Sequence, residues 1–202
     1  MKYLKLISLL LITSIGVLFT SCEETVEVDE YANWEGRNTE YINAIAQKAK
    51  NNDDGKWVKY LSFKLNEKDA NGNAYPHGNE CYIYCHKEVS GTGAKIESSL
   101  ASVSVNYRGR LIPTESYPEG LVFDESYKGV LKPEGERTNK PAEFYFSQVI
   151  VGWQTALLNM VEGDIWRVYI PAKLGYGSTE KTNIPAHSTL IFDINLVKVT
   201  NN

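Results

Sequence analysis

The sequence has no excess of basic residues. Its 202 residues include 21 lysines and arginines against 25 aspartates and glutamates, so the net charge is −4. Residues 1–21 hold two of the basic side chains and none of the acidic ones; without them, 19 basic and 25 acidic side chains leave a net charge of −6. Proteins that bind nucleic acid present a basic surface to the phosphates, and no such patch stands out. We therefore expect no nucleic-acid partner.

The chain also lacks the motifs of several common reaction classes. It shows no catalytic triad, no Walker motif and no pair of carboxylates at catalytic spacing. The loop Ser90-Gly91-Thr92-Gly93 is too short for a phosphate-binding loop and predicts a turn. These absences argue against nucleophilic hydrolysis and nucleotide binding.

Cysteine and histidine are scarce, with three residues of each. Cys81 and Cys85 fall in one aromatic, β-prone stretch, where a strand at ~3.3 Å per residue separates them by about 13 Å. A disulfide needs Cα atoms within about 7 Å, so we expect these two thiols to stay free. His77 and His86 lie nearby, but the strand directs His86 away from the cysteines. We expect neither a metal nor a cofactor.

The N-terminal apolar run is too short for a typical transmembrane helix. Lys2 and Lys5 precede apolar residues 6–19, and small residues then lead to Cys22. This arrangement resembles a bacterial lipoprotein signal, in which residues 1–21 are removed and Cys22 receives the lipid. The alternative is an ordinary signal peptide that leaves Cys22 free. Lipidation would anchor the protein in the bacterial cell envelope without spanning the membrane.

Two segments separate Cys22 from the main domain. Residues 22–32 contain five acidic side chains and predict a solvated tether, or alternatively an export signal towards the outer membrane. In residues 33–79, apolar side chains recur at helical spacing from Trp34 to Ala49, with Asn33 as N-cap. The apolar stripe of this helix needs a partner, which is either the main domain or a second copy in a homodimer. Residues 56–65 predict a strand or a second packing segment.

Residues 80–202 form the main domain. Strands are predicted at 81–86, 103–111, 122–126, 144–146, 166–171 and 189–197. A short helix is predicted over 154–160, and Gly163 follows it. The pattern predicts an α+β fold in which a curved antiparallel sheet wraps one helix. Trp153, at the helix start, either packs in the core or lies on the floor of a pocket.

Six motifs occur in order along this domain: V-x-V-x-Y-x-G, V-F-D-x-S, Q-V-I-x-G-W, M-x-x-G, I-P-x-x-L-x-Y-G and I-P-x-x-S-T-L-x-F. Together they resemble the FKBP-type peptidyl-prolyl cis–trans isomerases over roughly residues 80–200. The resemblance implies a five- or six-stranded antiparallel sheet around one helix, in agreement with the strand pattern. It also implies proline-containing polypeptide clients.

The implied chemistry explains an apolar pocket. Rotation about an X–Pro bond breaks amide resonance, at a barrier of ~18–20 kcal/mol. The planar amide is strongly dipolar and the twisted one is not, so a water-poor pocket favours the twisted transition state. No nucleophile or metal is required. The alternative is a non-catalytic module that holds clients or a partner through the same pocket or through the N-terminal extension.

The resemblance assigns pocket roles residue by residue. It implies that Trp153 supports the prolyl ring and that aromatic rings form the walls, namely Tyr107, Phe123 and Phe192. The further substrate-binding positions are Val149 and Ile184.

The resemblance also assigns the polar groups of the pocket. It implies that the Ile150 N–H and the Tyr176 hydroxyl hold substrate carbonyls. Asp124 would face the twisting amide, and we expect the Tyr107 hydroxyl to join it.

Two positions depart from the family pattern. An arginine usually lies five residues after Asp124, where this chain has Gly129. Because a carboxylate facing an apolar pocket needs a cation or donors, we expect Lys128 or Arg137 to fold back towards Asp124. Arg137 is preferred because its planar guanidinium can bind a carboxylate through two hydrogen bonds.

The family's pocket phenylalanine corresponds to Ala142, which would open one wall of the pocket. Both departures bear on the level of activity and on affinity for the immunosuppressant macrolides.

The lipid hypothesis predicts that Cys22→Ala moves the protein from the membrane fraction to the soluble fraction, because the acyl chains at Cys22 hold it on the bilayer. Cell fractionation with immunoblotting measures the shift. If the variant stays with the membrane, the hypothesis is wrong and the apolar segment is retained instead.

Overall fold

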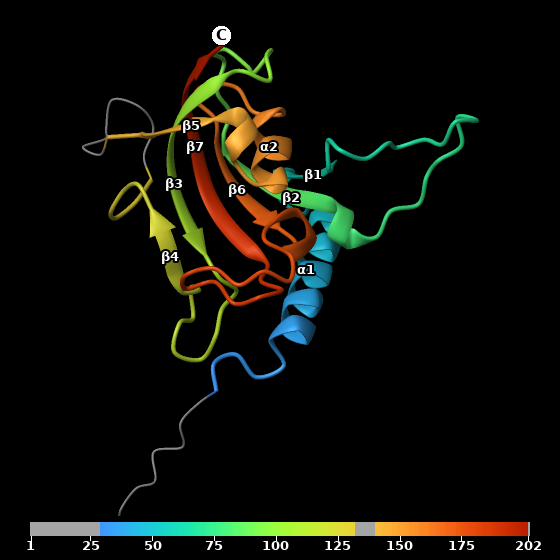
Figure 1. Cartoon of the computed structure of the whole chain (residues 1–202), viewed down its shortest axis with the longest axis vertical. Coiled ribbons are helices and arrows are strands. Elements are labelled where there is room, and N and C mark those ends of the chain that lie inside the picture. The colour runs from blue at the N-terminus through green and yellow to red at the C-terminus, as the bar shows by residue number, and fades with distance from the viewer. Residues whose placement is uncertain (1–28, 132–139, 202) are drawn as a thin grey trace, which may run out of the picture.

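In the part of the chain that the structure describes, residues 29–131 and 140–201, seven antiparallel strands form one curved sheet and two α-helices cover its opposite faces (Figure 1). This architecture comes from a computed structural model. The strands are β1 Trp57–Leu61, β2 Tyr82–Val89, β3 Ser102–Arg110, β4 Val122–Glu125, β5 Ala142–Tyr145, β6 Ile165–Ile170 and β7 Leu190–Thr200. The helices are α1 Trp34–Asn51 and α2 Val151–Leu157. Short 3-10 turns are η1 Asn79–Cys81, η2 Phe146–Gln148 and η3 Ala172–Leu174.

The sheet has the strand order β1-β2-β6-β7-β3-β4, and β5 also pairs with β3. Its six strands β2 to β7 come from the described part of residues 80–202 and curve around α2, which confirms the predicted fold. The seventh strand, β1, belongs to the N-terminal extension. It pairs with β2 in the register Trp57↔His86 to Leu61↔Tyr82, so the extension continues the sheet.

Side chains alternate between the two faces of the sheet. On β2, Ile83 and Cys85 point into the core around α2, whereas Tyr84 between them points to the convex face and packs near α1. Cys85 is fully buried, and Cys81, in the turn before β2, is also buried; both thiols are free.

Helix α2 ends earlier than predicted. It spans Val151–Leu157 rather than residues 154–160. The N–H groups of Asn159 and Met160 bond to carbonyls three residues back, which tightens the chain into a turn. The Asp164 carboxylate then accepts the Val161 N–H at 2.8 Å, so the chain leaves the helical path before reaching β6.

The stripe of α1 packs on the convex face of the sheet. Ile42 and Ile45 are buried with Trp57, Tyr84 and Tyr169 in a second, smaller core. The main domain, the first of the two predicted alternatives, is therefore the partner of this stripe. Trp57 and Tyr169 stack with ring centroids 5.6 Å apart, which joins the extension to β6.

The start of α1 also holds the loop before β7. The Trp34 indole N–H donates to the Ser188 hydroxyl at 2.9 Å. Asn38, which is 2% exposed, accepts the Thr189 N–H at 2.7 Å and donates to the Trp34 carbonyl at 2.7 Å. Asn33 lies at the predicted cap position in a left-handed conformation, with φ of 48°, but makes no side-chain cap.

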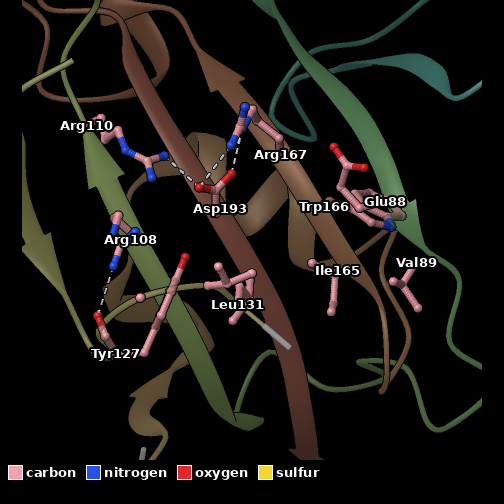
Figure 2. Close-up of a pocket in the computed structure, with 12 residues that line it drawn as sticks. Glu88, Val89, Arg108, Arg110, Tyr127, Leu131, Ile165, Trp166, Arg167 and Asp193 are labelled. Atoms are coloured by element: carbon pink, nitrogen blue, oxygen red, sulfur yellow. Dashed lines mark hydrogen bonds and ion pairs between the residues drawn. The ribbon is translucent and has the colours of Figure 1, made fainter. Parts of the chain in front are cut away.

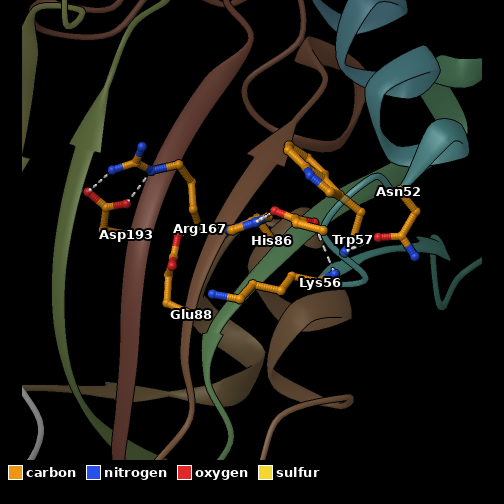
Figure 3. A network of polar contacts seen from close by, with 8 residues as sticks. Asn52, Lys56, Trp57, His86, Glu88, Arg167 and Asp193 are labelled. Carbon is orange, nitrogen blue, oxygen red and sulfur yellow. Dashed lines mark hydrogen bonds and ion pairs between the residues drawn. The ribbon is translucent and has the colours of Figure 1, made fainter.

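A polar network fastens the turn between α1 and β1 to β2 (Figure 3). The two ring nitrogens of His86 lie 2.7 Å from Asp54 Oδ2 and 2.8 Å from Glu88 Oε1. Beside it, the Asn52 side chain accepts the Trp57 N–H at 2.8 Å and so fixes the first residue of β1.

Several sequence predictions lie outside the described residues: the signal segment 1–21, Cys22, most of the tether 22–32, and Arg137. Across residues 29–131 and 140–201, no helix combines the length and apolar character needed to cross a bilayer.

Asn38→Ala should lower the free energy of unfolding by about 1–3 kcal/mol, because the buried Thr189 N–H would lose its acceptor. Urea unfolding followed by circular dichroism measures the change. The control is Glu40→Ala, an exposed position on the same helix, which should stay within about 0.5 kcal/mol of wild type. Equal effects of the two substitutions would show that α1 does not hold this loop through Asn38.

Candidate active site

A cavity of about 220 Å³ opens between the start of α2 and the inner face of the sheet. Eight of the nine residues predicted to form the pocket line it. The lining residues are Tyr107, Phe123, Asp124, Phe144, Gln148, Val149, Ile150, Trp153, Tyr176 and Phe192.

Trp153 lies at the centre of the aromatic residues. It is 4% exposed, and its ring meets Tyr107, Phe144 and Phe192 edge-to-face at centroid distances of 5.3, 5.8 and 5.2 Å. The preceding Gly152 brings the helix close to β6, since a Cβ there would lie 2.4 Å from the Ile170 side chain. Edge-to-face contacts are a preferred geometry of aromatic pairs, so the floor and walls of the cavity pack together as one aromatic cluster.

The outer wall depends on a glycine in β3. Phe123 from β4 and Phe192 from β7 meet edge-to-face, with centroids 5.5 Å apart. Gly109 lies between them, and a Cβ at that position would come within 2.5 Å of the Phe123 ring and 2.7 Å of Phe192. Any side chain at this position would push the two rings apart.

Asp124 is held by a tyrosine. The Tyr107 hydroxyl donates to Asp124 Oδ2 at 2.7 Å, which confirms the expected contact. Burial, and then this hydrogen bond and the charge of Asp124, raise the pKa of Tyr107, so the phenol keeps its proton and remains a donor.

Of the two expected replacements for the family arginine, Lys128 is wrong, and Arg137 lies outside the described residues and stays a prediction. Lys128 pairs with Glu125, which also accepts the Arg108 Nε at 2.8 Å. Asp124 and Glu125 are adjacent in β4 and point to opposite faces, so the Lys128 contact lies on the other side of the sheet from Asp124. Among the described residues, no basic side chain bonds to Asp124.

Two further donors border the cavity. The Ile150 N–H has no acceptor among the described residues, and the Tyr176 hydroxyl likewise has none there. Burial and the charge of Asp124 raise the pKa of Tyr176, so this phenol also keeps its proton. The buried Gln154 side chain donates to the Val149 carbonyl at 2.9 Å, and its N–H to the Ile150 carbonyl at 3.0 Å. Gln154 therefore orients the segment that presents the free N–H.

Sequence reasoning missed two lining residues and placed one wrongly. Phe144 shares a face of β5 with Ala142, so the alternation of the strand could have identified it. Ala142 itself, which was expected to open one wall, does not line the cavity. No comparable sequence pattern would have identified Gln148 as a lining residue. Ile184 does not line the cavity: it is 5% exposed, belongs to the core, and exchanges two 2.9 Å backbone hydrogen bonds with Lys181.

A larger cleft of about 420 Å³ lies on the convex face of the sheet (Figure 2). Its arginines are already paired: Arg110 Nη1 and Arg167 Nε each lie 2.6 Å from the Asp193 carboxylate. Burial by itself would raise the pKa of Asp193, but the hydrogen bonds and charges of Arg167 and Arg110 outweigh it and keep this pKa below its ordinary value. The cleft therefore offers little uncompensated charge, and the aromatic cavity is the better candidate site.

Comparisons with known proteins agree with this geometry. The model of the FKBP-type peptidyl-prolyl cis-trans isomerase family matches residues 93–197. The chain is 41% identical over 111 residues to the outer membrane protein MIP of Legionella longbeachae, covering 54% of this chain and 41% of that protein. The peptidyl-prolyl cis-trans isomerase of Pseudomonas syringae pv. tomato has a crystal structure that matches with a TM-score of 0.54 and 26% identity, covering 86% of this chain and 98% of that one.

The length of the matches differs between relatives. The chain spans 36% to 41% of three curated relatives. The macrophage infectivity potentiator of Trypanosoma cruzi is 30% identical over 188 residues, which cover 92% of this chain and 80% of that protein. Because the family model spans more than half of the chain and the Trypanosoma relative aligns over most of its length, the chain belongs to the FKBP-type peptidyl-prolyl cis–trans isomerase family.

Proposed function

We propose that this protein isomerises X–Pro peptide bonds and so assists the folding of exported proteins. The observation that carries the proposal is the aromatic cavity around Trp153, with Asp124 at its border together with two hydrogen-bond donors that have no acceptor among the described residues. Family membership supports the same activity, and relatives aligned to this chain bear the name peptidyl-prolyl cis-trans isomerase.

The cavity suits a reaction that consists of one bond rotation. A prolyl ring seated on Trp153 would exclude water from the X–Pro amide. The Ile150 N–H and the Tyr176 hydroxyl would each hold a substrate carbonyl, which fixes the chain on either side while the amide twists. Because the twisted amide has lost its resonance dipole, it is less penalised than the planar form by an apolar environment. Asp124, kept in place by Tyr107, would face the rotating carbonyl.

We also propose that the protein acts in the bacterial cell envelope, held there by a lipid on Cys22. The N-terminal signal pattern supports this location, as does the name of the Legionella relative, an outer membrane protein. A homodimer through α1 would have to use the exposed side of that helix, because the apolar stripe packs against its own sheet.

The isomerase proposal predicts that micromolar protein accelerates the cis-to-trans conversion of a Leu-Pro or Phe-Pro tetrapeptide at least tenfold over the spontaneous process, which takes tens to hundreds of seconds. A protease-coupled assay measures the rate. A rate equal to the uncatalysed one, with the peptide still bound, would favour the alternative of a non-catalytic binding module.

Tyr107→Phe should reduce kcat/KM by roughly tenfold, because Asp124 would lose the donor that holds it against an apolar wall. Tyr145→Phe is the matched control, since Tyr145 is 57% exposed and lies outside the cavity lining. It should match wild type. If the two variants have equal rates, the Tyr107–Asp124 hydrogen bond has no part in the reaction.

A further inference from the structure

Strand β1 forms an open edge of the sheet. It pairs with β2 on one side, and among the described residues no strand pairs with its other side (Figure 1). The Ser62 N–H donates to the Cys81 carbonyl at 2.9 Å, and the Lys87 N–H to the Lys56 carbonyl at 3.0 Å. In an antiparallel ladder alternate residues bond to the same neighbour, so even-numbered residues face β2 and odd-numbered residues face outwards.

The outward backbone N–H groups at the two ends of this edge have hydrogen-bond acceptors, but the outward groups at its centre have no partner among the described residues. The Trp57 N–H is bound by the Asn52 side chain at 2.8 Å, and the Phe63 N–H lies 3.4 Å from the Thr155 hydroxyl. Between them, the outward N–H and C=O groups of Lys59 and Leu61 have no partner within the described residues. Two residues at i and i+2 therefore offer the hydrogen bonds that an added strand would use.

A groove of about 530 Å³ wraps this edge. Its walls include Tyr60, Leu61 and Tyr82 from the strands and three exposed apolar side chains that follow β1 or come from the loop before β2. Phe63 is 42% exposed, Leu65 36% and Tyr75 57%. Natural sheets usually protect an open edge with charges, proline or bulges. Strand β1 carries one charged residue, Lys59, and no proline, and the exposed aromatic rings beside it suit the edge to binding.

The end of β1 lies close to the turn that borders the catalytic cavity. The Phe63 ring lies 6.3 Å from Phe146, centroid to centroid. Phe146 begins the turn η2, whose last residue, Gln148, lines the catalytic cavity. The Phe63–Phe146 contact therefore joins the end of the β1 edge to the turn that borders the aromatic cavity.

We propose that the β1 edge and its groove bind an extended segment of a non-native client polypeptide as an added β-strand, separately from the X–Pro pocket. The free backbone groups recognise any extended chain, and the aromatic side chains add affinity for apolar residues. The surface thus binds clients without requiring proline, an activity beyond isomerisation.

A second copy of this chain fits the edge less well than a client does. Antiparallel pairing of β1 with itself about its central residue would place two Lys59 side chains opposite each other, and like charges there are destabilising. In the structure the Lys59 ammonium lies 4.5 Å over the Tyr82 ring. We therefore expect a neutral or acidic residue of the client opposite Lys59.

The test is fluorescence anisotropy of the full chain with a labelled, proline-free octapeptide of alternating valine and threonine that has one central glutamate. Lys59→Pro removes an outward N–H and leaves every bond to β2, so it should raise Kd at least tenfold. Lys59→Ala keeps the N–H and is the matched control, with Kd within twofold of wild type. Isomerase activity on a tetrapeptide should be the same in all three proteins, and an X–Pro tetrapeptide should not displace the octapeptide.

If circular dichroism shows that Lys59→Pro does not fold, a second pair of variants tests the same proposal. Tyr75→Ser should raise Kd at least threefold, whereas Tyr145→Ser, equally exposed at 57%, should not. The proposal is overturned if wild type does not bind the octapeptide, if Lys59→Pro or Tyr75→Ser binds as well as wild type, or if the X–Pro tetrapeptide displaces it. A concentration-dependent dimer that Lys59→Pro converts to monomer would assign the edge to a second copy instead.

Discussion

The edge-to-face packing of Trp153 against three other aromatic rings is the interaction on which the site depends. The rings come from α2, β3, β5 and β7, elements that only the curvature of the sheet brings together. Gly152 and Gly109 make this possible, because each allows a close approach that a side chain would block. The cavity therefore owes its shape to backbone proximity as much as to the aromatic residues themselves.

The features predicted correctly from the sequence are those that local sequence patterns indicate. Alternation of apolar residues located the strands, and the ordered motifs identified eight residues that line the cavity. The errors concern contacts that depend on neighbouring chain segments. Lys128 pairs with Glu125 on the convex face, Ile184 lies in the core and bonds to Lys181, and after α2 the Asp164 carboxylate binds the Val161 N–H. None of these partners is evident from sequence spacing.

The N-terminal extension is built into the structure of the domain. Helix α1 covers one face of the sheet and, through Trp34 and Asn38, holds the loop that leads into β7. Strand β1 extends the same sheet. The extension thus supports, from the convex face, the strand β7 that carries Phe192. It also forms the open edge of the sheet at β1.

The ion pairs on the convex face have a consequence for the cavity on the other side. Asp193 in β7 is bound by Arg110 from β3 and Arg167 from β6, so one carboxylate ties three neighbouring strands together. Its neighbour Phe192 points the opposite way and forms a wall of the cavity. The proposed isomerisation requires no nucleophile, so it would rely on the accuracy of the shape of the cavity. The ion pairs on the convex face therefore help to set that shape. A change of charge at Asp193 would alter the cavity through strand β7, which carries both Asp193 and Phe192.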